Sequence, residues 1–237
     1  MRRTRQPLLF ALRTIIERTF DLDTGIRDLS HYIIGDRGLA LLYEERSGSA
    51  REGIFRCGSA APGNDPIGAR TLLREESGRL LVNLYYPDRL IRNLEVHDPF
   101  RSLSDANVDD FATFIEELDH LLTVADRHRA GAEISLLELE LHANVTKELV
   151  VSLFVARHRG TERLESRDRA WIRHHLFHKV TYAEEDAGIQ ARYRDATALA
   201  VRYLEALYAL RPTERLRELR RFHRRTHHEK LESIVRG

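Results

Sequence analysis

Carboxylate and imidazole side chains recur at helical spacing in two neighbouring segments of the chain. Glu117 and His120 are three residues apart in the first segment, and Glu138 and His142 are four residues apart in the second. Residues at these spacings lie on the same face of an α-helix. Carboxylate oxygens and neutral imidazole nitrogens together suit iron, manganese or zinc. The two segments therefore predict a metal site, provided that their helices pack against each other.

Apolar periodicity predicts that both segments are helical, over residues 108–125 and 132–157. The short polar turn between them predicts an antiparallel hairpin, which is how bundles build sites between facing helices. With the turn placed near Arg129, Glu117 is expected beside His142, and His120 beside Glu138. The hairpin would then bring all four candidate ligands to a similar level along the helix axes.

Helical phase separates these four residues. At about 100° per residue, Glu138 falls inside the apolar stripe of the second helix, and Glu148 falls near it. His120 is expected on the side of its helix opposite the apolar stripe, towards solvent or a second layer. A buried carboxylate needs a partner, because an unpaired buried charge is very costly. The alternative to a metal is that Glu138 and Glu148 pair with arginines and that His120 is exposed.

The Glu-x-x-His pattern of Glu117 and His120, together with a central helix that carries Glu138 and Glu148, resembles the ferritin-like carboxylate bundle superfamily. In that superfamily two Glu and two Glu-x-x-His motifs bind a dinuclear metal centre. The second Glu-x-x-His motif is absent from this chain. The resemblance therefore implies a helical bundle that holds a mononuclear metal site or a small ligand between its helices, or that lacks the metal.

Four further histidines pair at helical spacing, His174 with His178 and His223 with His227. The second pair falls on the apolar stripe of the last helical segment, where imidazoles can act as ligands or transfer protons. Neither pair has the intervening glutamate of a His-Glu-x-x-His protease helix. The alternative is that these are hydrogen-bonded interior or boundary histidines. No complete catalytic motif is present, so the sequence selects no reaction.

Basic residues are concentrated near the C-terminal end of the chain. Residues 211–230 hold eight arginines and lysines against three glutamates. Such a helix suits the phosphate backbone of nucleic acid, an acidic patch on a partner protein, or another copy of the chain. The candidate anion-binding residues are Arg217, Arg220, Arg221, Arg224 and Arg225. The alternative is a solvated helix face whose arginines pair with acids elsewhere in the chain.

Composition and patterning predict a mainly α protein, a helical bundle with a small β-hairpin element in its N-terminal third. The net charge is only +1, so no field of the whole molecule favours nucleic acid or membrane. A single cysteine excludes an intrachain disulfide and suits the cytoplasm. No apolar stretch reaches the ~18 residues that span a bilayer. Residues 1–237 are expected to form one domain, with the bundle over 104–237.

Glycine and turn residues set residues 35–86 apart from the helical remainder. Two strand–turn–strand units are expected there, at 39–57 and 71–85. Their apolar residues stand at both odd and even positions rather than at every second one, so helix is an alternative for each strand. Further helices are expected near the N-terminus (8–20) and at about 167–179, 189–207 and 213–235.

Overall fold

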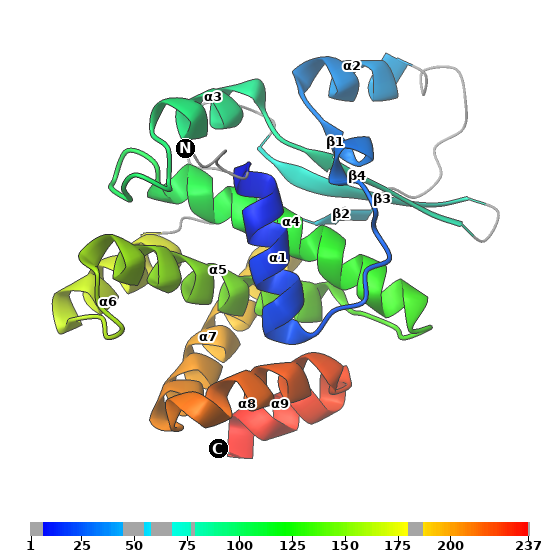
Figure 1. The fold of residues 1–237 in the computed structure, drawn as a ribbon. Helices are drawn as coiled ribbons and strands as arrows, with labels where there is room; N and C mark the ends of the chain where they lie inside the picture. Colours follow the sequence, from blue (N-terminus) through cyan, green and yellow to red (C-terminus); the bar gives the residue numbers. More distant parts are fainter. Residues whose placement is uncertain (1–6, 45–54, 58–67, 77–78, 180–186, 237) are drawn as a thin grey trace.

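The computed structural model describes residues 7–44, 55–57, 68–76, 79–179 and 187–236. These ranges contain nine α-helices and a four-stranded sheet in the order β1-β4-β3-β2 (Figure 1). The helices are α1 (Leu8–Phe20), α2 (Asp36–Glu44), α3 (Asp88–Val96), α4 (Val108–Arg129), α5 (Leu136–Arg159), α6 (Ser166–Arg173), α7 (Ala187–Ala209), α8 (Pro212–Arg224) and α9 (His227–Arg236). The strands are β1 (Ile33–Ile34), β2 (Phe55–Cys57), β3 (Arg70–Glu76) and β4 (Arg79–Tyr85), and two short turns of helix are η1 (Leu29–His31) and η3 (His174–His178). The predicted mainly α class with a small N-terminal β element is confirmed.

Helices α4 and α5 form the predicted hairpin at the centre of the molecule (Figure 1). The turn between them lies about four residues later in the chain than expected, because α4 continues to Arg129 and α5 begins at Leu136 rather than near residue 132. Ser135 caps α5 by accepting a hydrogen bond from the backbone N–H of Glu138 at 3.1 Å. Gly160 ends α5 in the left-handed conformation, with φ at 63°.

Both central helices are covered on several sides. Strands β3 and β4 pack on α4, as do α1, α3 and α5, while α5 also contacts α6 and α7. In consequence α4 buries polar as well as apolar residues over most of its length. His120, expected to face solvent or a second layer, is fully buried, so the alternative in which it is exposed is wrong. The reason is that its side chain faces α5, where His120 Nε2 lies 3.8 Å from Glu140 Oε2.

The sheet confirms the second predicted strand pair and corrects the first. Strands β3 and β4 are antiparallel from Arg70 opposite Tyr85 to Glu76 opposite Arg79, and β1 adds to β4 in parallel. Residues 36–44 form α2 and not a strand. Helix α2 packs through Leu39 on the sheet residues Leu72 and Tyr85, which a helix with one apolar face can do. The turn expected at 47–49 lies outside the described residues.

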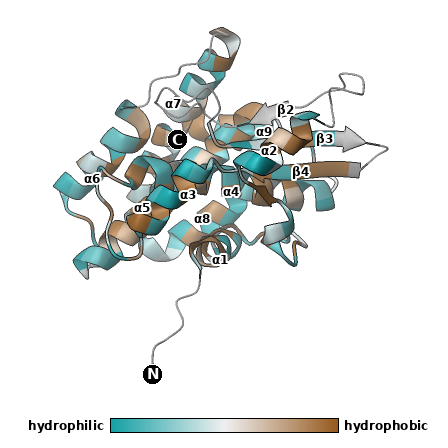
Figure 2. Cartoon of the chain, turned by 90° about the horizontal axis from the view of Figure 1, so that it is seen from above, coloured by the Kyte–Doolittle hydropathy of each residue, from teal (hydrophilic) through white to brown (hydrophobic). Residues whose placement is uncertain are grey.

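The C-terminal segment is divided into two helices where one was expected. Arg225 leaves the helical region with ψ at 147°, and Thr226 begins the turn into α9 by exchanging hydrogen bonds with Glu229. Helix α7 lies close to its expected bounds, and the segment expected at 167–179 is α6 followed by a π-helical turn. In Figure 2 the central strand β4 is largely hydrophobic and the outer helix α6 largely hydrophilic. Within the described ranges, no helix has the length and apolar character to cross a membrane.

Candidate metal centre

Three metal-capable side chains meet between α4 and α5. Glu116 and His120 lie one turn apart on α4, and Glu140 reaches them from α5. One ligand atom of each residue lies within 4.8 Å of the others, and all three residues are buried. His120 Nε2 is 3.8 Å from Glu140 Oε2. Among the described residues this is the one group of three or more such side chains at this spacing.

His120 is the residue of this group whose polar atoms have no hydrogen-bond partner. It is 0% exposed, and neither Nδ1 nor Nε2 forms a hydrogen bond. Burial lowers the pKa of His120 and outweighs the opposing effect of the Glu116 and Asp119 charges. The imidazole is therefore held neutral, which is the form that binds a metal ion.

Two neighbours complete the surroundings of the group. Lys147 of α5 donates to Glu116 Oε2 at 2.7 Å. Thr71 of β3 donates to Glu117 Oε2 at 2.8 Å, whereas Glu117 Oε1 has no partner. Burial, and then the charges of Glu116 and Glu140, raise the pKa of Glu117 well above its ordinary value. The sheet thus contributes directly to the polar interior of the hairpin.

The hairpin register differs from the expected one by two residues. His120 faces Glu140, where Glu138 was expected, and His142 faces Asp119 rather than Glu117. The turn between the helices lies later in the chain than expected. Each residue of α4 therefore faces a residue of α5 with a higher number than predicted. Of the four candidate ligands, the structure places His120 in the three-residue group and the other three in separate polar contacts.

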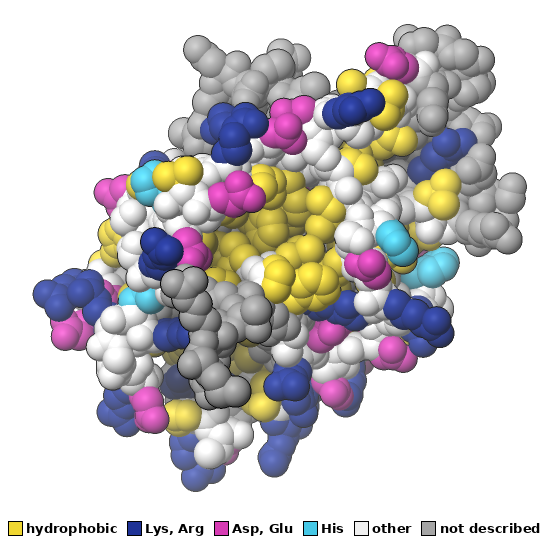
Figure 3. All heavy atoms as spheres, turned by 45° about the horizontal axis from the view of Figure 1, so that its top comes forward, with side chains coloured by type: hydrophobic (Ala, Val, Ile, Leu, Met, Phe, Trp, Pro, Cys, Tyr) yellow, Lys and Arg dark blue, Asp and Glu magenta, His cyan; other side chains and the backbone are white. Residues whose placement is uncertain are grey.

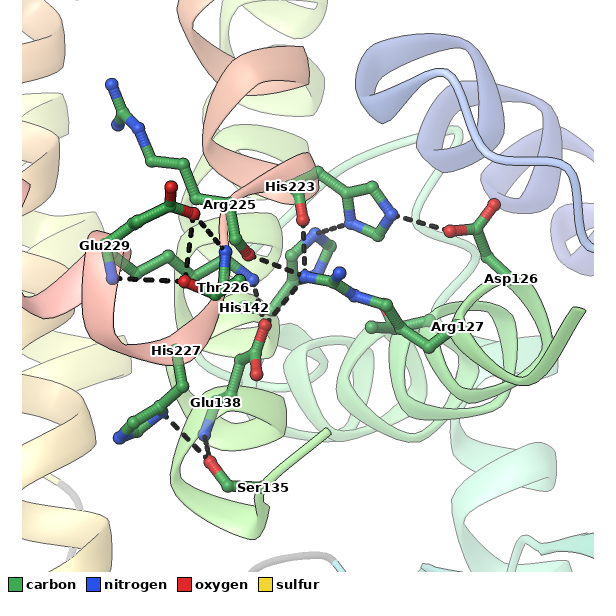
Figure 4. A network of polar contacts seen from close by, with 12 residues as sticks. Asp126, Arg127, Ser135, Glu138, His142, His223, Arg225, Thr226, His227 and Glu229 are labelled. Atoms are coloured by element: carbon green, nitrogen blue, oxygen red, sulfur yellow. Dashed lines mark hydrogen bonds and ion pairs between the residues drawn. The ribbon is translucent and has the colours of Figure 1, made fainter. Parts of the chain in front are cut away.

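Glu138 is the centre of a buried ion cluster (Figure 4). Arg127 donates to Glu138 Oε1 at 2.8 Å, and Lys230 of α9 also forms an ion pair with this oxygen. Arg127 Nη2 further donates to the backbone carbonyls of His223 and Arg225, at 2.6 and 2.9 Å. The partners of this carboxylate are therefore an arginine and a lysine, and they connect the α4–α5 hairpin to the turn between α8 and α9.

Glu148, the second carboxylate near the apolar stripe, has hydroxyl partners. It accepts hydrogen bonds from Tyr208 of α7 and, at 3.2 Å, from Ser152. Burial raises the pKa of Glu148, and these two hydrogen bonds oppose that effect. The expected arginine partner is replaced by hydroxyl groups.

His142 belongs to a hydrogen-bonded chain of four side chains. His142 Nδ1 lies 2.8 Å from Asp119 Oδ2, and its Nε2 lies 3.2 Å from His223 Nδ1. His223 Nε2 lies 2.8 Å from Asp126 Oδ2 (Figure 4). The Phe20 ring packs on His142 with a centroid separation of 4.2 Å. The sequence pairing of His223 with His227 gives no indication of this contact, which joins α4, α5 and α8.

We expect His223 to destabilise the fold as the pH falls. Burial, and then the nearby His142, lower the pKa of His223 to about 4, although Asp126 opposes the shift. The unfolded chain binds a proton near pH 6.5. The contribution of neutral His223 to the free energy of unfolding is therefore fully present above about pH 6.5. It is lost as the pH falls towards 4, by up to about 1.4 kcal/mol per pH unit.

Urea unfolding of the parent protein and of His223→Asn between pH 7 and pH 4 would measure this loss. The variant should show a shallower decline, and His228→Asn, which replaces an exposed histidine, should match the parent. Equal slopes for the parent and His223→Asn would contradict the assignment.

The other candidate histidines lie near the surface. His227 Nδ1 is 3.1 Å from Ser135 Oγ, while His174 and His178 are exposed in the π-helical turn η3. The buried histidine of that turn is His175, whose two ring nitrogens each lie 3.1 Å from a carboxylate, of Asp109 and of Asp105. Sequence reasoning did not single out His175, because its partners are about 70 positions away in the chain.

Most of the candidate anion-binding arginines contact their own chain. Arg224 pairs with Asp21, Arg225 and Arg221 with Glu218, and Arg220 donates to the carbonyl of Arg18. Arg217 is exposed. Binding of nucleic acid, an acidic partner or another copy of the chain through 211–230 stays a prediction, and these contacts lend it no support.

The chain matches no protein-family model, no curated protein and no solved structure. Its class is therefore defined by the fold and the polar groups alone. It is a helical protein with a small sheet and a buried Glu-His-Glu cluster, which is compatible with the ferritin-like resemblance.

Proposed function

We propose that the α4–α5 hairpin binds a single divalent transition-metal ion through Glu116, His120 and Glu140. The observation that carries the proposal is His120, a fully buried imidazole without a hydrogen-bond partner that lies beside two carboxylates. Buried polar atoms without a hydrogen-bond partner destabilise a fold. A bound metal ion would give the His120 imidazole such a partner, which accounts for a histidine at this buried position. Two carboxylates and one imidazole favour iron, manganese or zinc.

Three protein ligands leave coordination positions for water or another molecule. Structural zinc sites are usually closed by four protein ligands, whereas reactive sites keep an open position. An open position allows the metal to activate a bound molecule. We therefore propose a reactive or ligand-binding centre rather than a metal that only stabilises the fold.

The proposed centre modifies the ferritin-like interpretation. Glu116 and His120 stand four residues apart, so the pair on α4 is Glu-x-x-x-His and not the Glu-x-x-His of Glu117 and His120. Glu140 supplies the carboxylate of the facing helix. With no second motif, the centre is mononuclear.

Metal analysis of protein expressed in medium with added iron, manganese and zinc tests the proposal. The parent should retain about one equivalent of one metal, and His120→Asn or Glu116→Gln less than about 0.2 equivalents. His97→Asn, at an exposed histidine, is the matched control and should retain the metal.

A second variant separates the proposed ligands from the set Glu117, His120, Glu138 and His142. His142→Asn should keep the metal, since His142 already bonds to Asp119 and His223. Loss of metal from His142→Asn with full retention in Glu116→Gln would contradict the proposal, as would a parent protein without metal.

A further inference from the structure

A second candidate site lies outside the hairpin, in an open cleft of about 770 Å³. The cleft is bounded by the loop at 102–106, the C-terminal end of α5, and α6. Its volume falls within the range of roughly 300–1,000 Å³ that is typical of small-molecule pockets. We propose that this cleft binds a small organic anion that carries an apolar ring.

The buried side chain of Asn107 helps to hold the loop side of the cleft in place. The Asn107 amide donates to the carbonyls of His97 and Ser102, at 2.8 and 2.9 Å, and accepts from the backbone N–H of Ser104 at 2.9 Å. Asn107 is buried. A binding surface that is already ordered loses less entropy when a ligand binds.

The apolar part of the cleft is formed by Leu103, Val155 and Trp171. Trp171 Nε1 donates to Asp105 at 2.9 Å, and its ring packs on His175 at a centroid distance of 4.7 Å. These two contacts fix the indole ring. A fixed aromatic ring in a mostly apolar lining favours a ligand with a ring of its own.

The charged part of the cleft favours an anion. His158, Arg159 and Arg167 line it, and His158 Nε2 is a buried atom without a hydrogen-bond partner. The Arg167 side chain is 70% exposed and pairs with an equally accessible glutamate, Glu165. Such surface pairs contribute little and exchange readily.

The two acids of the lining already have partners inside the protein. Asp105 accepts from Trp171 and contacts His175 while its side chain stays 81% exposed, and Asp168 is buried beside Arg159. Arg159 uses Nη2 for Asp168 at 3.1 Å, and its remaining N–H groups are donors for a ligand. The N–H groups of Arg159 and Arg167 outside these ion pairs, together with His158 Nε2, are the groups that an anion would contact.

Trp171 is the only tryptophan of the chain, so intrinsic tryptophan fluorescence reports directly on this cleft. Titration with benzoate should give a saturable change in emission at millimolar concentrations or below. Benzyl alcohol, which keeps the ring without the charge, and acetate, which keeps the charge without the ring, should bind more weakly. No saturable change with benzoate, or equal affinity for benzyl alcohol, would overturn the proposal.

Variants on the rim test the role of charge. Arg167→Gln should weaken benzoate binding about three- to fivefold, in the range of an exposed charge contact. Arg163→Gln, which replaces an exposed arginine outside the lining, is the matched control and should bind as the parent does. Unchanged affinity in Arg167→Gln, with the fold verified by circular dichroism, would count against the assignment.

Figure 3 shows acidic and basic side chains dispersed around a central group of apolar side chains on one face of the molecule. Nothing in the described part of the chain indicates an occupant of that apolar group, so we assign no ligand to it.

Discussion

Replacing Glu138 by glutamine is expected to lower the free energy of unfolding by about 3–5 kcal/mol. Glu138 is 2% exposed and is the shared carboxylate of Arg127 and Lys230. The glutamine keeps the size of the side chain but leaves two buried cations without a counter-charge. Lys230 already shows the cost of burial, since its pKa is lowered to about 8 although Glu138 opposes the shift.

Urea unfolding at pH 7 measures this effect, and Glu133→Gln provides the matched control. Glu133 is exposed, so that variant should lie within about 0.5 kcal/mol of the parent. A loss below about 1 kcal/mol in Glu138→Gln would show that the ion cluster is hydrated or formed differently.

Replacing His120 by leucine is expected to raise the stability of the metal-free protein by about 1–3 kcal/mol. The two nitrogens of His120 are buried without hydrogen bonds, so an apolar side chain of similar size removes an uncompensated cost. The same variant should lose the proposed metal. Residues retained at the expense of stability are typical of functional sites.

His142→Leu is the matched comparison, because it makes the same change in a neighbouring buried histidine. His142 bonds to Asp119 and His223, so its removal leaves a buried carboxylate without its imidazole partner and should destabilise the protein. Thermal and urea unfolding in the presence of a chelator compare the two variants. Destabilisation of similar size in both would mean that His120 has partners after all.

The fold could be predicted from the sequence where one pattern dominated. Leu12, Ile16 and Phe20 are buried at four-residue intervals along α1, and long apolar periodicity located α4, α5 and α7. Prediction failed at 36–44, where short apolar runs suit strand and helix equally. It also failed after Arg224, where α8 ends and α9 soon begins without an intervening proline or glycine. Helix α9 begins with hydrogen bonds between Thr226 and Glu229, and the apolar pattern does not indicate them because both residues are polar.

The hairpin that carries the Glu116, His120 and Glu140 cluster was predicted from the sequence. Which residues form the cluster depended on details that the apolar pattern does not contain. Ser135 was available as a capping residue, and starting α5 there would have placed Glu140 opposite His120. The Glu116 and His120 pair at four-residue spacing was also visible in the sequence. By contrast, the hydrogen bond of Glu117 with Thr71 comes from the sheet, 46 positions away, and contacts such as His142 with His223 join residues 81 positions apart.

Anomalous X-ray diffraction from crystals of the metal-loaded protein is the most direct test of the central claim. At the absorption edge of the bound metal, we expect one peak, within coordination distance of about 2.0–2.3 Å from the Glu116 and Glu140 carboxylates and a ring nitrogen of His120. No peak between α4 and α5, or a peak bound instead by His142 and His223, would contradict the claim.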